Sequence, residues 1–223
     1  MDFDDSDWAS ASICAYDDHI VTAQQSAMLV FEHIAPVQTK VEGNRVLLDF
    51  GATYVGYLDA VACGNAGDEI VVRCGQELSD DGSVRYALRA NCVYEEKWIL
   101  GTGESRLCWF DYKAFRYAEL ILPAGAQLVR AALRARHYPF ELKAALKPAY
   151  AQDEQLRRIW ELCVNTQKYG VQEVIQDCME REKGFYLGDG CYTALAHMIL
   201  TGDDTMARKL IEDAFSTSFI TDG

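Results

Sequence analysis

The chain has 223 residues, half of them apolar and a quarter charged, which is ordinary for a globular protein with a substantial core. Its formal net charge of −13 argues against a nucleic-acid partner and against an anionic membrane surface, because contacts with phosphate need lysine and arginine. No basic segment followed by an apolar one opens the chain, and no stretch approaches the roughly 20 apolar residues of a membrane span. These features predict a cytoplasmic protein.

The eight cysteines are scattered and include no Cys-x-x-Cys pair, so the sequence predicts no zinc site and no cofactor. Without an export signal we expect them to be reduced, mostly buried thiols. Cys178 lies in an acidic tract, where a nucleophile is conceivable. Its carboxylate neighbours would raise the pKa of the thiol, which favours a packing role.

Residues 1–36 read as an acidic lead-in, in which Asp2, Asp4, Asp5 and Asp7 precede Trp8. Such a cluster could chelate calcium, but it lacks the glycine and the ligand spacing of a known calcium loop. We therefore expect a solvated, partly ordered segment.

Residues 37–147 carry the pattern of short β-strands. Val46, Leu48 and Phe50 fall on one face of the first run, and turn residues separate it from the others. We expect strands at 45–50, 53–61, 69–74, 93–100, 106–110, 116–122 and 128–135. Many short strands with turns between them predict an antiparallel sandwich or barrel, and we favour a β-sandwich.

From residue 148 the apolar period becomes helical. The first helix begins near Asp153 and ends at Gly170, and the third is capped by Asp203. The three predicted apolar stripes are Leu156, Ile159, Trp160, Cys163 and Val164; then Tyr192, Leu195, Ala196, Ile199 and Leu200; then Met206, Leu210, Ile211 and Ala214. The predicted domains are thus 1–36, 37–147 and 148–223.

Between the first two helices lies the acidic loop, residues 177–189. It holds four carboxylates, one arginine and two aromatic rings, with Gly184 and Gly188 allowing sharp turns. Glycosidases need one carboxylic acid to protonate the leaving oxygen and others to hold hydroxyls or activate water. A sugar-cleaving site and a solvated acidic loop are both consistent with this composition.

The acidic loop resembles the active-site signature of the bacterial α-L-rhamnosidases, glycoside hydrolase family 78. Asp177-Cys178-x-x-Arg181-Glu182 followed by Gly188-Asp189 matches the family pattern Asp-Cys-Pro-x-Arg-Glu, an aromatic, and Gly-Asp. Met179 stands where the family has proline. Residues 3–8, 48–51, 75–82 and 111–117 resemble the family as well.

The resemblance implies that Glu182 is the general acid and that Asp177 and Asp189 hold sugar hydroxyls. It also places Arg181 at the substrate site. For the residues alone, three other roles stay open: Asp177 as a turn cap, Asp189 as the N-cap of a helix from Gly190, and Arg181 as a clamp between the two aspartates.

Two aromatic side chains complete the expected site. Tyr186 or Phe185 would stack on an apolar face of the sugar. Burial of Glu182 against either ring would raise the pKa of its carboxyl, as an acid requires, whereas Arg181 would lower it.

The family hydrolyses terminal α-L-rhamnosides with inversion, on an (α/α)6 barrel. The resemblance therefore implies a fragment with a β-sandwich and the first barrel helices, a rhamnose-containing glycoside as substrate, and a general base outside this chain. The isolated chain would then be inactive. A non-catalytic carbohydrate-binding module is the alternative, and a piece that needs a completing chain or a homo-oligomer is another, because exposed apolar stripes favour association.

Overall fold

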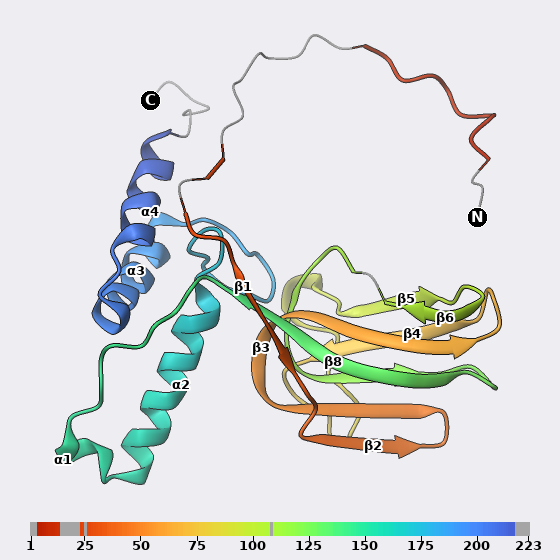
Figure 1. The fold of residues 1–223 in the computed structure, drawn as a ribbon, viewed down its shortest axis with the longest axis horizontal. Coiled ribbons are helices and arrows are strands. Elements are labelled where there is room, and N and C mark those ends of the chain that lie inside the picture. The colour runs from red at the N-terminus through yellow and green to blue at the C-terminus, as the bar shows by residue number, and fades with distance from the viewer. Residues whose placement is uncertain (1–3, 14–22, 25, 108, 217–223) are drawn as a thin grey trace.

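The computed structural model describes residues 4–13, 23–24, 26–107 and 109–216, so Asp2, Cys14 and Cys108 lie outside the described residues. All strands of this part precede its α-helices. Figure 1 shows the strands gathered into one body beside the helices. The predicted antiparallel β-sandwich followed by helices is confirmed.

The strands form antiparallel pairs in the order β1-β8-β3-β7-β4-β5, and β2 and β6 both pair with β3. Their bounds are β1 (Val30–Ile34), β2 (Gln38–Glu42), β3 (Arg45–Gly64), β4 (Glu69–Gly75), β5 (Glu95–Ile99), β6 (Gly103–Arg106), β7 (Lys113–Ile121) and β8 (Gln127–His137). The first half of β3 pairs with β2 and β7, and the second half pairs with β6 and β8. The long strand β3 is therefore shared by both layers of the sandwich (Figure 1).

Two glycines allow β3 to take this path. The register of β3 against β7 shifts between Asp49 and Tyr54, and Gly51 lies within the shift at φ +84°, where a side chain would be strained. At Gly56, an added Cβ would lie 2.1 Å from the carbonyl oxygen of Arg134, so only glycine permits the close approach of β8.

The apolar core lies between the layers. Val46, Leu48 and Phe50 are all buried, as their alternation predicts. The rings of Phe50 and Phe115 meet edge to face with centroids 5.9 Å apart, a favourable geometry for aromatic pairs. Full burial of one such side chain contributes about 1.5–3 kcal/mol.

Some strand predictions were wrong in their bounds. The runs predicted at 45–50 and 53–61 form the single strand β3, and the run predicted at 106–110 is replaced by β6, which ends at Arg106. Strands β1 and β2 were not predicted, because each has only five residues and most of their side chains are exposed. β1 lies inside the segment that we assigned to the lead-in.

The α-helices are α1 (Pro148–Ala151), α2 (Glu154–Gly170), α3 (Leu187–Thr201) and α4 (Thr205–Ser216). The Asp153 carboxylate accepts the backbone N–H of Leu156 at 3.1 Å and caps α2. Asp203 accepts the N–H of Thr205 at 2.9 Å and begins α4. The predicted cap at Asp203 is confirmed, and α2 begins beside Asp153 as predicted, with Asp153 as its N-cap.

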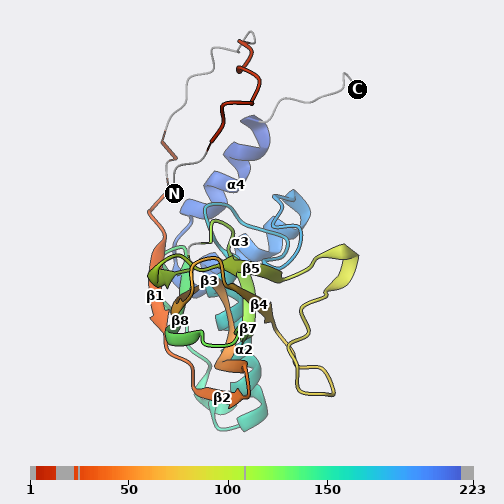
Figure 2. The same ribbon diagram turned by 90° about the vertical axis from the view of Figure 1, so that its right-hand side faces the viewer.

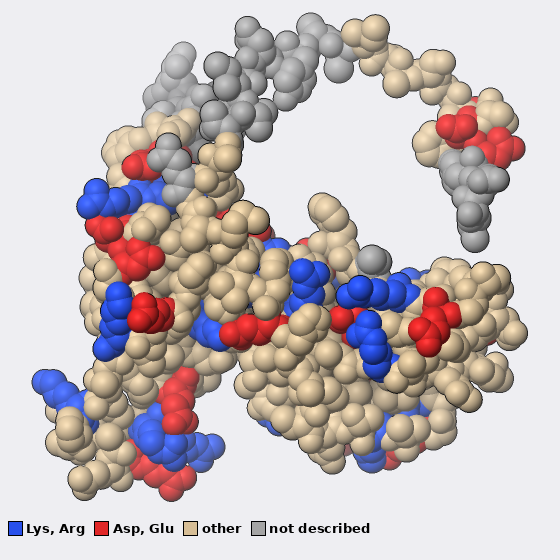
Figure 3. Space-filling model, in the orientation of Figure 1, with Lys and Arg blue, Asp and Glu red and all other residues tan. Residues whose placement is uncertain are grey.

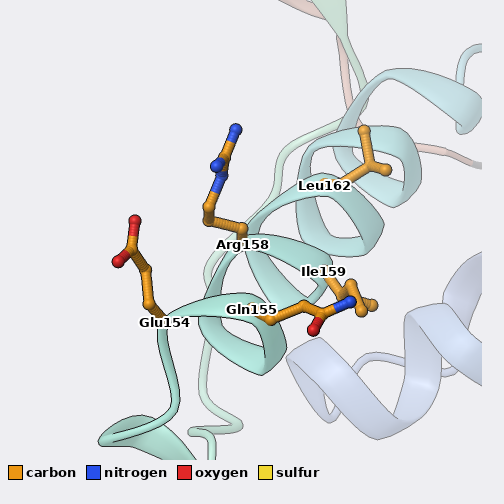
Figure 4. Close-up of a pocket in the computed structure, with 5 residues that line it drawn as sticks. All are labelled: Glu154, Gln155, Arg158, Ile159 and Leu162. Atoms are coloured by element: carbon orange, nitrogen blue, oxygen red, sulfur yellow. The ribbon is translucent and has the colours of Figure 1, made fainter.

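Much of the apolar stripes on α2 and α3 is exposed, in agreement with the exposed stripes expected from the sequence. Ile159, Tyr192 and Ile199 are 49%, 80% and 65% exposed. The buried side of α3 consists instead of Gly190, Ala194, His197, Leu200 and Thr201. On α4, Met206 and Leu210 are buried, whereas Ile211 is exposed. Figure 4 shows the outer surface of α2, where Ile159 and Leu162 line a shallow groove.

A second, smaller core joins the helices to the end of the sandwich. It is formed by Tyr138, Val171, Ile175, Ala194, Met206 and Leu210. Ion pairs reinforce the junction: the Lys168 ammonium on α2 lies 2.9 Å from a Glu32 oxygen on β1, and Arg136 on β8 pairs with Glu173. The described helices include none that is long and apolar enough to span a membrane.

Candidate functional site

The acidic loop follows α2 after residues 171–176, and its last three residues, 187–189, form the first turn of α3. Its neck is closed by two hydrogen bonds: the Asp177 carboxylate accepts the Gly184 N–H at 2.8 Å, and the Asp177 N–H donates to the Gly184 carbonyl at 3.0 Å. Burial raises the pKa of the Asp177 carboxyl, but the N–H groups of Gly184 and Cys178 outweigh it and hold that pKa below its ordinary value. Asp177 therefore does act as a turn cap.

One side of the loop is held at Glu180 by the connection between β4 and β5. The Tyr94 hydroxyl donates to the Glu180 carbonyl oxygen, and the Cys92 thiol lies 3.9 Å from the same oxygen. The Gln76 amide donates to the Glu180 carboxylate at 2.9 Å. Because backbone and side chain are both bound, Glu180 is a fixed point between the loop and the sandwich.

The other side is held at Lys183. Its ammonium lies 2.8 Å from the Asp111 carboxylate, donates to the Tyr112 carbonyl at 2.6 Å and stands 4.3 Å from the centre of the Tyr112 ring. Lys183 has φ +52°, a conformation that a non-glycine residue keeps only when its surroundings enforce it. These contacts are sufficient to do so.

Arg181 and Glu182 lie between the two anchors, at the exposed edge of the loop. A guanidinium nitrogen of Arg181 is 2.5 Å from a Glu182 oxygen, and the Glu182 N–H donates to the Cys178 sulfur at 3.4 Å. Interaction with the nearby Glu182 carboxylate raises the pKa of the Tyr186 phenol. Three of the predicted site residues are thus in contact.

The expected burial of Glu182 is wrong. Its side chain is 34% exposed, and Phe185 packs into the small core with Tyr138 rather than against the carboxylate. Arg181 pairs with its neighbour Glu182, so its role as a clamp between two aspartates is not supported by the contacts of the described residues.

Asp189 lies apart from this pair, in the first turn of α3. Tyr186 is the N-cap of α3 and the helix begins at Leu187, so the alternative role of Asp189 as N-cap is wrong. Its carboxylate is exposed and is favoured there by the helix dipole. Among the described residues, no three His, Cys, Asp or Glu side chains are grouped as a metal site would require.

A groove of about 560 Å³ runs beside the loop, with Glu180 and Arg181 on one wall. Gln76, Glu77, Arg85, Arg89 and Ala90 form the other wall. Sequence reasoning missed this wall, because its residues lie about 90–100 positions before the acidic loop. Figure 3 shows positive and negative side chains interspersed where the helices meet the sandwich.

Residues 39–134 match the family model of the bacterial alpha-L-rhamnosidase concanavalin-like domain. The solved alpha-L-rhamnosidase of Dictyoglumus thermophilum is similar with a TM-score of 0.73 and 19% identity, over 87% of this chain and 23% of that one. That of Streptomyces avermitilis, complexed with L-rhamnose, gives 0.73 and 20%, over 90% and 20%. The rhamnosidase from Klebsiella oxytoca with rhamnose bound gives 0.66 and 19%, over 82% and 44%.

The chain thus spans less than half the length of each of these relatives. No curated protein sequence matches it. The resemblance to the rhamnosidases is confirmed, and its strongest support lies in the sandwich. The acidic loop lies outside residues 39–134, so the roles of Asp177, Arg181, Glu182, Tyr186 and Asp189 stay predictions.

Proposed function

Because residues 39–134 match the family model of the bacterial alpha-L-rhamnosidase concanavalin-like domain, we propose that the chain is part of a glycoside hydrolase that cleaves terminal α-L-rhamnosides with inversion. The substrate is then a rhamnose-containing glycoside. The cytoplasmic location also remains a proposal.

The observation that carries the proposal is the setting of Glu182. The loop is bound to the sandwich at Glu180 and at Lys183, so the carboxyl between them is held in place while remaining open to a ligand. A general acid needs both properties, since it must reach the leaving oxygen within hydrogen-bonding distance. In the proposed step, the Glu182 proton passes to the glycosidic oxygen as the bond to the anomeric carbon breaks.

The neighbouring groups have separate proposed roles. Arg181 orients the Glu182 carboxyl, and the half-exposed Tyr186 ring offers a stacking surface to the sugar. Asp189 supplies an exposed carboxylate for sugar hydroxyls. Asp177 already uses one oxygen to close the loop, so its main contribution is to shape the site.

Inversion needs a second carboxylate, roughly 6.5–9.5 Å from the acid, to activate water. We assign none of the described residues to this role. Glu212 is exposed on α4 and is treated as a solvated charge. We therefore expect the isolated chain to show little or no turnover.

The test is release of nitrophenol from p-nitrophenyl α-L-rhamnoside, by this chain and by a chain extended through a complete helical barrel. Activity of the extended chain should be lost in Glu182→Gln and kept in the matched control Glu212→Gln. Turnover by the isolated chain that depends on Glu182 would refute the assignment of the base to another segment. Equal activity of Glu182→Gln and the unmodified enzyme would refute the acid.

A second candidate function is sugar binding by the sandwich itself, favoured by a recess of about 400 Å³ on its surface. Phe31, Tyr57, Trp109 and Phe110 line it, and Phe110 is fully exposed. Exposed rings beside charged groups are typical of carbohydrate-binding surfaces. Rhamnose binding that is abolished by Phe110→Ser but unchanged by Glu182→Gln would favour this function.

A further inference from the structure

The wall of the groove opposite the acidic loop is a hairpin, residues 85–94, which we call the arginine hairpin. The Tyr94 N–H donates to the Tyr86 carbonyl at 2.9 Å, and the Cys92 N–H donates to the Arg89 carbonyl at 3.2 Å across the turn. The two central turn residues, Ala90 and Asn91, have φ of +53° and +59°. Positive φ at both central positions is typical of a type I′ turn, in which alanine is unfavourable.

Backbone strain is concentrated around the groove. Within the described residues, the non-glycine positions with positive φ are Ala90, Asn91 and Lys183. The first two form the tip of the arginine hairpin and the third follows Glu182 in the acidic loop, so they lie on the two segments that meet at Glu180. Strain of this kind collects at ligand-binding positions, where the surroundings enforce it.

The groove has a charge opposite to that of the chain. Its lining holds three arginines (Arg85, Arg89, Arg181) and two glutamates (Glu77, Glu180), which leaves one net positive charge, whereas the chain carries −13. Arg85 pairs with Glu77 at 2.7 Å. Within the described part of the chain, the Arg89 guanidinium has no ion pair, and its side chain is exposed.

The position of the groove relative to Glu182 suggests what it would hold. A general acid bonds to the leaving oxygen, so the leaving group must lie on the side of the acid. Arg181 lines the groove and is bonded to Glu182, so the groove extends from the acid on one side. Guanidinium groups bind carboxylates through two parallel hydrogen bonds.

We propose that the groove between the acidic loop and the arginine hairpin is a leaving-group subsite for a carboxylate-bearing sugar, bound by Arg89. The assignment to a leaving group rests on the proposed function. Glu182 must be protonated to act as acid, and Arg181 then loses its ionic partner and can bind the same carboxylate.

The test is binding of D-glucuronate to the full chain, with D-glucose as the neutral probe. Calorimetry measures the affinity, and the NMR signals of the arginine side chains show which arginine is involved. Glucuronate should bind more tightly than glucose and shift the Arg89 signal. Arg89→Gln should weaken glucuronate binding about tenfold or more, because a charge-assisted hydrogen bond is lost. The matched control is Arg158→Gln, whose side chain extends from α2 at a different groove (Figure 4), and it should bind like the unmodified chain.

Equal binding of the two sugars, no binding of either, or unchanged binding by Arg89→Gln would overturn the inference and leave the proposed function intact. Arg89-dependent glucuronate binding in a protein whose extended form cleaves no rhamnoside would overturn the leaving-group assignment together with the proposed function. Arg89 is exposed, so its substitution does not disturb the core.

Discussion

Replacing Lys183 by methionine should loosen the acidic loop, because this side chain makes three contacts with the sandwich. The hydrogen bond to the Tyr112 carbonyl comes from a charged donor and contributes about 1.5–3 kcal/mol. The position over the Tyr112 ring adds about 0.5–1 kcal/mol. Asp111 is 61% exposed, so that ion pair contributes about 0.2–1 kcal/mol.

Methionine keeps the aliphatic stem but none of these three contacts, so we expect a loss of about 2–5 kcal/mol in the free energy that holds the loop closed. The assay is hydrogen exchange of the Gly184 amide, which is bonded to Asp177 and reports local opening. Its exchange should accelerate roughly 30- to 4,000-fold in Lys183→Met.

The control is Lys97→Met, which removes an exposed ion pair with Glu69 on the sandwich and should change Gly184 exchange hardly at all. A change in Lys183→Met below about 0.5 kcal/mol, within the range of an ordinary surface substitution, would refute Lys183 as an anchor of the site.

Three further outcomes are expected. Ala90→Gly should raise the free energy of unfolding by about 0.5–1 kcal/mol in urea titrations, because glycine accepts the positive φ of the turn; a loss of stability would contradict the strain. Burial lowers the pKa of His197, so the folded state favours the neutral ring, and stability should fall by up to about 1.4 kcal/mol per pH unit as the pH drops below about 6.5. His197→Leu should remove that pH dependence. Identical pH profiles of stability for His197→Leu and the unmodified chain would exclude His197 as its source. Burial raises the pKa of the Cys74 thiol, so this thiol should react slowly with an aromatic disulfide reagent at pH 8. The reagent should modify the exposed Cys163 first and reach Cys74 only on unfolding. Mass spectrometry of the labelled peptides would show the order.

The sequence predicted those parts of the fold that local patterns determine. Alternation at Val46, Leu48 and Phe50 identified a buried face, and Asp153 and Asp203 identified two helix starts, because a strand face and a cap depend on near neighbours. The continuity of β3 was not predictable, since Gly51 looks like a turn residue and its bulge exists only when β7 pairs alongside.

The buried face of α3 could not be read from its large apolar residues, for a physical reason. Its large apolar residues, such as Tyr192 and Ile199, are exposed, whereas Gly190 and Ala194 face α4. A Cβ on Gly190 would lie 2.7 Å from the Leu210 Cδ1, so close helix packing selects small residues. A hydrophobicity scale that equates a large apolar side chain with burial does not identify a buried helix face made of small residues.

The candidate site was predictable as a composition but not as an arrangement. Arg181, Glu182 and Tyr186 are close in sequence and do lie in contact. The anchors of the loop are distant: Gln76 and Tyr94 bind Glu180 from 104 and 86 positions away. No local pattern shows that two hairpin segments of the sandwich will meet the acidic loop.

The sharing of β3 by both layers has a consequence for synthesis on the ribosome. β3 ends at Gly64, but its partner β8 ends only at His137. At about 5–20 residues per second, the ribosome leaves this 20-residue strand without its final partner for several seconds. An unpaired, largely apolar strand can bind other chains during that interval. Ribosome-bound chains that end before β8 should therefore recruit holdase chaperones more strongly than chains that extend past it.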